Sequence, residues 1–188
     1  MNPREKLLQT AFDEIYQNGY SATSVDKILK KAQMNKGSMY HFFKSKKALA
    51  LAVIEEKLML HITSKYEPLT HCKENIIDEL IKILKNREGF DFVNGCKLNN
   101  MVQELSPIDK DFKIALEKIY LVYENIFEEV LNNAVSAGEL KHDDVKALSI
   151  FTVASFEGCL VTAKKSQDGQ VYQTCISQLE LFLKTLSK

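Results

Sequence analysis

The sequence predicts an all-α fold of about nine helices, and two observations carry this prediction. Apolar residues recur at steps of three and four along nearly the whole chain, a spacing that gathers them on one face of a helix. The 188 residues contain only three prolines and seven glycines, and no segment shows the apolar–polar alternation typical of a strand. We expect helices over residues 3–19, 23–31, 35–43, 45–67, 73–87, 96–104, 107–137, 143–165 and 170–187.

Short signals at the helix ends support these limits. Pro3 suits the first turn of a helix, and Gly19 supplies a left-handed stop. Thr23, Asn35 and Ser45 each stand where a side-chain oxygen can accept a hydrogen bond from the first turn of a helix. The second and third helices are short and are joined by about four residues, which is typical of a helix-turn-helix.

The later helices are longer and amphipathic. The helix over 107–137 keeps one apolar face along its length and ends at Gly138. No repeat, low-complexity tract or flexible linker divides the chain. We therefore expect a three-helix helix-turn-helix domain over residues 1–48, packed rigidly on a larger helical domain over 49–188.

The charges are divided unequally along the chain. Residues 1–50 hold nine Lys/Arg against four Asp/Glu, a net charge of +5, whereas residues 51–188 hold sixteen against twenty-one, a net charge of −5. The positive charge accompanies the short helices, without a basic helix that carries a strong apolar face. This pattern favours an anionic partner for the N-terminal part, nucleic acid before membrane.

Targeting and redox signals are weak. The longest apolar run, residues 48–54, is far shorter than the roughly 20 residues that span a bilayer. We therefore expect a soluble cytoplasmic protein with no membrane partner. The four cysteines show no C-x-x-C spacing, so reduced thiols are expected rather than a disulfide framework.

The stretch NKGSMYHFFKSKKAL, residues 35–49, combines aromatic rings with lysines in a helical context. In a helix-turn-helix the second helix enters the major groove, so its outer face must be polar and free of acidic charge. Gly37 permits close approach of backbone and DNA, while Tyr40 and His41 present polar tips on flat rings. Met39 and Phe42 are expected to face the core.

Three lysines, Lys44, Lys46 and Lys47, gather around the start of the fourth helix. The free N–H groups of a helix start favour a phosphate. A cation such as Lys47 in the first turn opposes the helix dipole, and a nearby phosphate would remove that conflict.

The stretch TSVDKILKKAQMNKGSMYHFFKSKKAL, residues 23–49, resembles the DNA-binding signature of the TetR family of bacterial transcriptional regulators. The nine-helix layout is similar to that family over the whole chain, and GCKLNN (95–100) and AGEL (137–140) are similar to the effector domain of one subgroup. Gln33 stands where the family commonly has glycine, Leu29 where it commonly has alanine, and Lys47 where an acidic residue is common.

The resemblance implies base and phosphate contacts from Ser38, Tyr40 and His41, and phosphate contacts from Lys46 and from Thr23 or Ser24. Together with the residues chosen above, the expected DNA-binding set is Thr23, Ser24, Lys36, Gly37, Ser38, Tyr40, His41, Lys44, Lys46 and Lys47.

A single helix-turn-helix touches few base pairs, so specificity usually requires a dimer whose recognition helices lie about 34 Å apart on a palindromic site. The last two helices carry broad apolar faces, and the small residues Ala154 and Gly158 would let a partner helix approach closely. The resemblance favours a two-fold four-helix bundle; the alternative is that these faces are ordinary core. The expected dimer interface is Phe151, Ala154, Ser155, Gly158, Val171, Cys175, Leu179 and Phe182.

The middle of the chain supplies apolar and aromatic surface with a few polar groups, the usual composition of a small-molecule pocket. The residues expected to line it are Phe92, Cys96, Asn99, Asn100, Phe112, Tyr120, Tyr123 and Phe127. The alternative is again an ordinary core. A small apolar or amphipathic effector is the expected ligand.

Histidines and cysteines show no metal-ligand spacing, and no phosphate-cradling glycine loop or nucleophile elbow is present. We expect no metal, no cofactor and no enzymatic activity. The resulting hypothesis is a homodimeric transcriptional repressor that binds a palindromic operator on double-stranded DNA and is released by an effector. The alternatives are a helical carrier protein, a DNA-binding regulator without an effector, and a cysteine redox sensor that uses Cys96.

Overall fold

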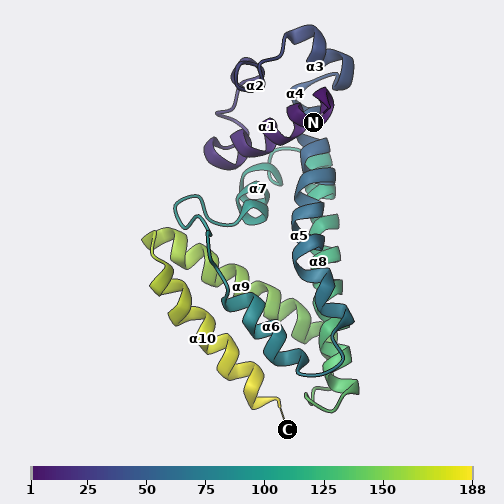
Figure 1. Cartoon of the computed structure of the whole chain (residues 1–188), viewed down its shortest axis with the longest axis vertical. Coiled ribbons are helices and arrows are strands. Elements are labelled where there is room, and N and C mark those ends of the chain that lie inside the picture. Colours follow the sequence, from purple (N-terminus) through teal and green to yellow (C-terminus); the bar gives the residue numbers. More distant parts are fainter. Residues whose placement is uncertain (1, 188) are drawn as a thin grey trace. The chain divides into compact units, whose positions relative to one another are not determined.

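The computed structural model describes residues 2–187, which form an all-α fold (Figure 1). Within these residues there are nine helices when α4, a π-helical segment and α5 are counted as one, two residues form an isolated bridge (Leu140 and Ser187), and there is no strand. The predicted fold class is confirmed. Contacts divide the chain into two compact units: the first holds the chain up to His61 together with Lys97–Ile119, and the second holds Ile62–Cys96 together with the chain from Tyr120 onward.

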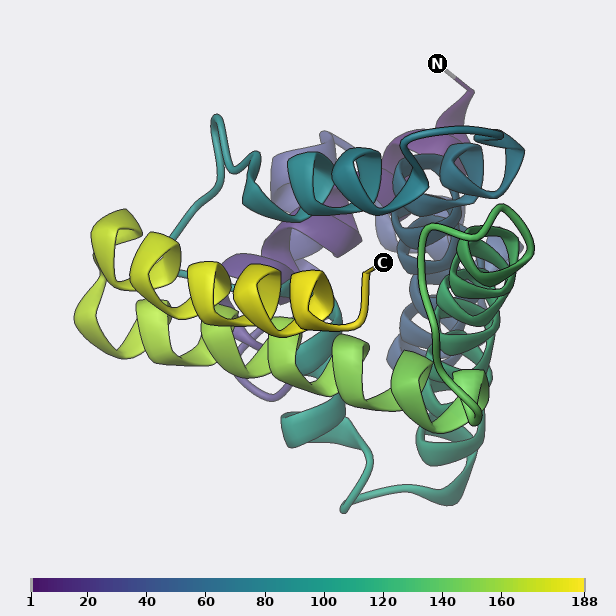
Figure 2. The same ribbon diagram turned by 90° about the horizontal axis from the view of Figure 1, so that it is seen from below.

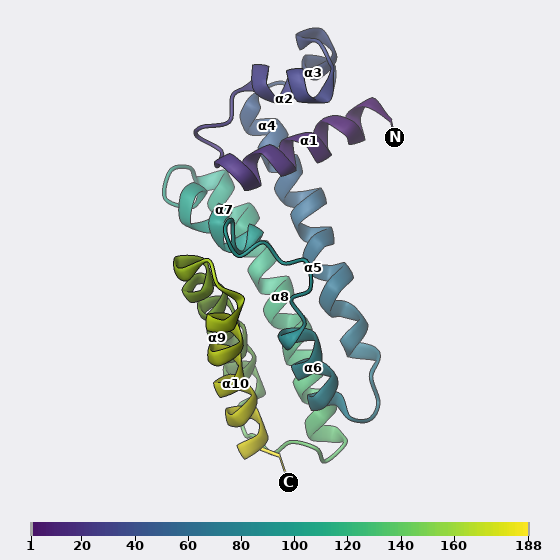
Figure 3. The ribbon, with the colours of Figure 1, turned by 60° about the vertical axis from the view of Figure 1, so that its left-hand side comes forward.

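The first unit contains the helix-turn-helix. Its helices are α1 (Pro3–Asn18), α2 (Val25–Ala32), α3 (Lys36–Phe42), α4 (Lys46–Ala52) with the π-helical segment Val53–Leu58, α7 (Lys97–Leu105), and the first part of α8 (Lys110–Ser136). Figure 3 shows α7 beside α1. The apolar faces of α1 to α4 bury Leu7, Leu8, Phe12, Ile28, Met39 and Leu49 almost completely. The association of residues 97–119 with these helices was not part of the expected division into 1–48 and 49–188.

The second unit contains most of α5 (Met59–Tyr66), a 3-10 turn (Glu67–His71), α6 (Ile76–Lys85), the rest of α8, α9 (Val145–Ser166) and α10 (Gly169–Thr185). Figure 2 shows α9 and α10 side by side. Tyr66, Tyr123, Phe127, Phe156 and Tyr172 are buried and form a connected cluster of ring contacts at its core.

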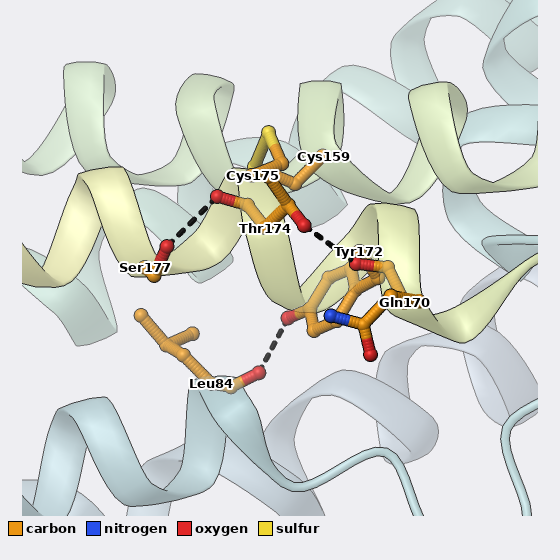
Figure 4. The surroundings of a disulfide bond; sticks show 7 residues. All are labelled: Leu84, Cys159, Gln170, Tyr172, Thr174, Cys175 and Ser177. Carbon is orange, nitrogen blue, oxygen red and sulfur yellow. Dashed lines mark hydrogen bonds between the residues drawn. A yellow bond between two sulfur atoms is a disulfide. The ribbon is translucent and has the colours of Figure 1, made fainter.

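A disulfide between Cys159 and Cys175 joins α9 to α10 (Figure 4). The expectation of four reduced thiols is therefore wrong for this pair, while Cys72 and Cys96 are not part of a disulfide in the described residues. Because α9 and α10 form a helical hairpin, two residues 16 positions apart come face to face with their Cα atoms 5.4 Å apart, a distance suited to a disulfide. Rules based on C-x-x-C spacing do not detect such a pair.

Most of the predicted helix ends agree with the structure. Gly19 ends α1 with φ 81°, and Asn35 and Ser45 cap α3 and α4 through their side chains. The cap of α2 is different, because Ser24 accepts the hydrogen bond from Lys27 N, whereas Thr23 is fully buried. The expectation that Thr23 caps α2 is therefore wrong, because the helix begins at Val25 and the capping position is Ser24.

Among the described residues, α9 alone is long and apolar enough to cross a membrane, judged by length and composition. Core helices of soluble proteins meet the same criteria. In this structure α9 packs against α10 and is bonded to it through Cys159.

Candidate nucleic-acid interface and effector region

The turn between α2 and α3 holds α3 in position. Gln33 adopts the left-handed conformation with φ 55°, and its N–H donates to the carbonyls of Leu29 and Lys30. Asn35 then caps α3 by accepting from Ser38 N (2.8 Å) and from Ser38 Oγ (3.2 Å). The turn therefore forms without the glycine that the family commonly has at this position.

One face of α3 is buried and the other is open to solvent. Met39 is completely buried and Phe43, just after the helix, is 5% exposed. Phe42 was expected to face the core, but it is only half-buried. The chain leaves the helix after Phe42 and becomes extended, and this turns the Phe43 side chain, not that of Phe42, into the core beside Met39.

The outer face of α3 carries no acidic residue. Tyr40 is 53% exposed, and Lys36, Gly37 and His41 are exposed as well. Lys36 pairs with Asp26 (3.0 Å), but both side chains are largely in solvent, where an ion pair contributes little. The polar tips expected to meet DNA are thus accessible on this face.

Lys46 and Lys47 are already bound within the first unit. Lys46 Nζ donates to the Tyr20 carbonyl (2.6 Å) and lies 4.1 Å from the centre of the Tyr20 ring, and burial lowers the pKa of its ammonium group. Lys47 Nζ bonds to Asp109 and Asp111, at 2.7 Å each, and these two carboxylates raise its pKa.

These contacts correct the expected role of Lys47. Its charge in the first turn of α4 is balanced by two carboxylates at the start of α8, so no phosphate is needed for that purpose. Thr23 requires the same correction. It is fully buried, and its hydroxyl donates to the carbonyls of Glu14 and Gly19, which leaves the exposed Ser24 as the residue that can reach a phosphate.

Two carboxylates in this unit were missed by sequence analysis. Glu104 on α7 accepts hydrogen bonds from Tyr20 N and Ser21 N, both at 2.8 Å, and these bonds lower its pKa against the effect of burial. Glu14 on α1 is 2% exposed and pairs with Lys31 (2.6 Å) and Lys27 (3.1 Å) of α2. Both carboxylates stabilise the connection between α1 and α2. Glu14 was detectable as a lone acidic residue among the apolar positions of α1.

The residues expected to line an effector pocket fall into both units. Phe92, Cys96, Tyr120, Tyr123 and Phe127 belong to the second unit, and Asn99, Asn100 and Phe112 belong to the first.

Phe112 is 2% exposed and packs edge-on against Tyr20, with ring centres 5.2 Å apart. It is therefore part of the core of the first unit, which corrects its expected place in a pocket. Tyr123 and Phe127 are fully buried against Tyr66, which agrees with the alternative interpretation of these rings as core. Tyr120 is half-buried, and burial raises its pKa.

Two buried charged residues of the second unit were also missed. Glu157 on α9 is 4% exposed and accepts a hydrogen bond from Cys96 Sγ (3.4 Å). Arg87, just after α6, is 8% exposed and lies against aromatic rings. Glu157 could have been found as the one acidic residue within an apolar helix; Arg87 sits in a polar loop sequence that gives no sign of burial.

The expected dimer residues lie on one face of α9 and α10. Phe151 (49% exposed) and Phe182 (37% exposed) contact each other with ring centres 5.0 Å apart. A groove of about 410 Å³ runs between the two helices, and its lining includes six of the eight expected residues: Phe151, Ser155, Gly158, Cys175, Leu179 and Phe182. Ala154 is exposed and Val171 half-buried.

Comparison with known proteins agrees with this geometry. Residues 7–53 match the family model of bacterial regulatory proteins of the tetR family, and residues 71–178 match the C-terminal domain of LmrA/YxaF-like transcriptional regulators. An HTH-type transcriptional regulator from the lacX 3′ region of Lactococcus lactis is 32% identical over 181 residues, which cover 92% of this chain and 89% of that protein. The HTH-type transcriptional regulator QacR of Staphylococcus aureus is 26% identical over 201 residues and is matched along the whole of both chains.

Solved structures show the same fold. The reduced form of Escherichia coli NemR has a TM-score of 0.83 at 22% identity and covers 100% of this chain and 98% of its own. A TetR regulator from Chloroflexus aurantiacus has a TM-score of 0.86 at 17% identity and covers 98% and 96%. The helix-turn-helix, the matched domains and these relatives together identify a DNA-binding protein that is not an enzyme. The chain belongs to the TetR family of transcriptional regulators.

Proposed function

We propose that this regulator is a homodimeric cytoplasmic repressor, which binds a palindromic operator through α3 and leaves it when a small molecule binds the second unit. The observation that carries the proposal is the outer face of α3, which is exposed, polar and free of acidic residues. That face is what a helix in the major groove requires.

The proposed DNA contacts follow the exposure of the side chains. Tyr40, His41 and Ser38 would reach base edges and phosphates from α3. Gly37 is exposed and has no side chain to keep DNA from the backbone, and a Cβ there would lie only 3.3 Å from Asn35 Oδ1, which caps the helix. Ser24, Lys36, Lys44 and Lys46 are proposed as phosphate contacts. The Lys46 ammonium group gives one of its three N–H donors to the Tyr20 carbonyl, which leaves two for a phosphate.

The proposed dimer uses the exposed aromatic pair and groove of α9 and α10. Phe151 and Phe182 present apolar surface next to a concave region of about 410 Å³, into which side chains of a second copy can insert. A two-fold axis between such faces would pair the helix-turn-helix units of two chains, as a palindromic operator requires.

Release by an effector needs only a modest free energy. A ligand that prefers the non-binding conformation by about 1 to 3 kcal/mol changes operator affinity by about 5- to 150-fold. A cysteine redox sensor at Cys96 is the less favoured alternative, because its thiol donates to the Glu157 carboxylate and a neighbouring negative charge disfavours the reactive thiolate.

A direct experiment selects operators from random double-stranded DNA with the purified protein at two salt concentrations, with the mass of the complex measured in parallel. We expect a palindrome bound by a dimer. Tyr40→Ala should weaken binding, and Lys44→Ala should also reduce the salt dependence by about one unit of slope. Lys118→Ala, which removes the same charge from α8, is the matched control.

Enrichment of no sequence above random DNA by the folded protein would contradict the operator proposal. The alternative of a helical carrier protein, with a ligand bound in the second unit, would then be favoured.

A further inference from the structure

Arg87 is a buried cation whose hydrogen bonding is incomplete. It follows α6, and only 8% of its surface is exposed. Its Nη1 atom donates to the carbonyls of Ile83 (3.1 Å) and Asn86. These bonds fix one end of the guanidinium group at the C-terminal end of α6, where helix carbonyls lack partners of their own.

Aromatic rings surround the guanidinium group. Its central carbon lies 4.7 Å from the ring centre of Phe156, 5.2 Å from that of Tyr172 and 6.0 Å from that of Phe90. The Tyr172 ring is itself held, because its hydroxyl donates to the Leu84 carbonyl (Figure 4). The rings attract the cation through their faces. The Tyr172 hydroxyl also interacts with the Arg87 side chain: burial raises the pKa of Tyr172, and Arg87 opposes that rise.

Two nitrogens of Arg87 remain without a partner. Within residues 2–187, neither Nε nor Nη2 reaches a hydrogen-bond acceptor, although both atoms are buried. These two nitrogens share one edge of the planar guanidinium group, so their N–H bonds are parallel. That edge matches the two oxygens of a carboxylate.

We propose that Arg87 anchors the effector, and that the effector is a carboxylate with a flat apolar body. The carboxylate would accept from Nε and Nη2, and the apolar body would lie against the aromatic rings of Phe90, Phe156 and Tyr172. This inference rests on the proposed response to a small molecule and assigns its chemical class. The competing interpretation is that Arg87 only caps α6 and packs against the rings.

Benzoate and benzamide separate the two interpretations, because they share size and flatness and differ in charge. Binding of each to the full-length protein is measured by calorimetry and by thermal unfolding, and release of the selected operator by fluorescence anisotropy. We expect benzoate to bind, to raise the unfolding midpoint and to release DNA, and benzamide to do none of these. This comparison uses the wild-type protein, so it holds even if a variant fails to fold.

The variants then test the residue. Arg87→Gln should weaken benzoate binding by about 10- to 100-fold, the loss expected for a hydrogen-bonded ionic contact. Arg87→Lys keeps the charge but lacks the parallel N–H pair, so it should also bind benzoate more weakly than wild type. Lys82→Gln removes the same charge from the exposed side of α6 and should bind like wild type.

Five outcomes are decisive. The proposal is overturned if wild-type protein fails to bind benzoate, binds benzamide equally well, or binds benzoate as tightly after Arg87→Gln. Benzoate binding that depends on Arg87 but leaves DNA bound supports the carboxylate site and contradicts its role as the effector site. A protein that selects no operator contradicts the proposed function alone, because benzoate binding is measured without DNA.

Discussion

At the scale of single residues, Glu14 is a clear case of a buried charge with a structural purpose. Hydrogen bonds from Lys31 and Lys27 lower its pKa below the ordinary value of 4.5 despite its burial. A carboxyl group whose pKa is lower in the folded than in the unfolded state stabilises the fold above the unfolded value. That stabilisation is lost as the pH falls through the folded value.

We therefore predict that Glu14→Gln lowers the free energy of unfolding by about 1 to 3 kcal/mol at pH 7, the range for hydrogen bonds to charged groups. The difference from wild type should shrink below pH 4.5, where the unfolded carboxyl group is protonated. Urea denaturation at pH 7 and pH 3 measures both values. Glu117→Gln, an exposed position on α8, is the control, and an undiminished difference at pH 3 would contradict the explanation.

Two of the residues whose roles were wrongly expected, Lys47 and Phe112, share one physical cause. Lys47 and its partners Asp109 and Asp111 are 62 and 64 positions apart in sequence, and Phe112 packs against Tyr20 from a helix far along the chain. The local sequence predicts the typical exposure and charge of a helix face. It cannot report which distant group arrives beside a side chain after folding.

At the scale of elements, the turn between α2 and α3 forms with Gln33 at a position that favours glycine. Gln33 and Gln167 both occupy left-handed conformations after a helix, with φ 55° and 51°. A side chain is disfavoured there and glycine is not. We predict that Gln33→Gly raises the free energy of unfolding by about 0.5 to 1 kcal/mol and leaves operator affinity unchanged.

Chemical denaturation and a DNA titration check that prediction. Gln17→Gly, in the last turn of α1, is the control with the opposite expected sign, since glycine inside a helix costs about 1 kcal/mol. A loss of stability in Gln33→Gly would mean that the Gln33 side chain makes a favourable contact that outweighs its backbone strain.

The α9–α10 hairpin provides a second prediction at this scale. The Cys159–Cys175 bond closes a loop of 16 residues, and a loop of that length is expected to stabilise the folded state by about 3 kcal/mol. Dithiothreitol should lower the unfolding free energy of the wild type by about that amount and leave the Cys159→Ala/Cys175→Ala variant unchanged. Equal sensitivity of the two proteins would show that the loss of stability does not come from the Cys159–Cys175 bond.

The helices themselves were predictable because their signals are local. Helix-end residues such as Asn35, Ser45 and Gly19 act within one turn of their own position. Hydrophobic periodicity is equally local, and the helix ends that it predicts for α6 to α10 lie within about three residues of the observed ends, the usual uncertainty of such limits. The disulfide and the association of residues 97–119 with the first unit depend on contacts between distant segments, and those contacts appear only in the structure.

At the scale of the whole molecule, the proposed repressor depends on pairing two chains through α9 and α10. Phe151 and Phe182 expose large apolar area on this face, and burial of apolar area is the main favourable contribution to such an association. Introducing a charge at the centre of an apolar interface should prevent pairing, because the charge would have to lose its water. It should not unfold the chain, since both rings are partly in solvent already.

We therefore predict that Phe151→Glu/Phe182→Glu has the mass of one chain, 21.5 kDa, where the wild type has twice that mass. A monomer presents one α3 and can occupy only one half-site, so its affinity for the full palindrome should fall to that for a half-site. Light scattering and a DNA titration measure the two effects. Leu121→Glu, at a similarly exposed apolar position on α8, is the control and should remain dimeric. If the double variant is still a dimer, the interface does not lie on this face of α9 and α10.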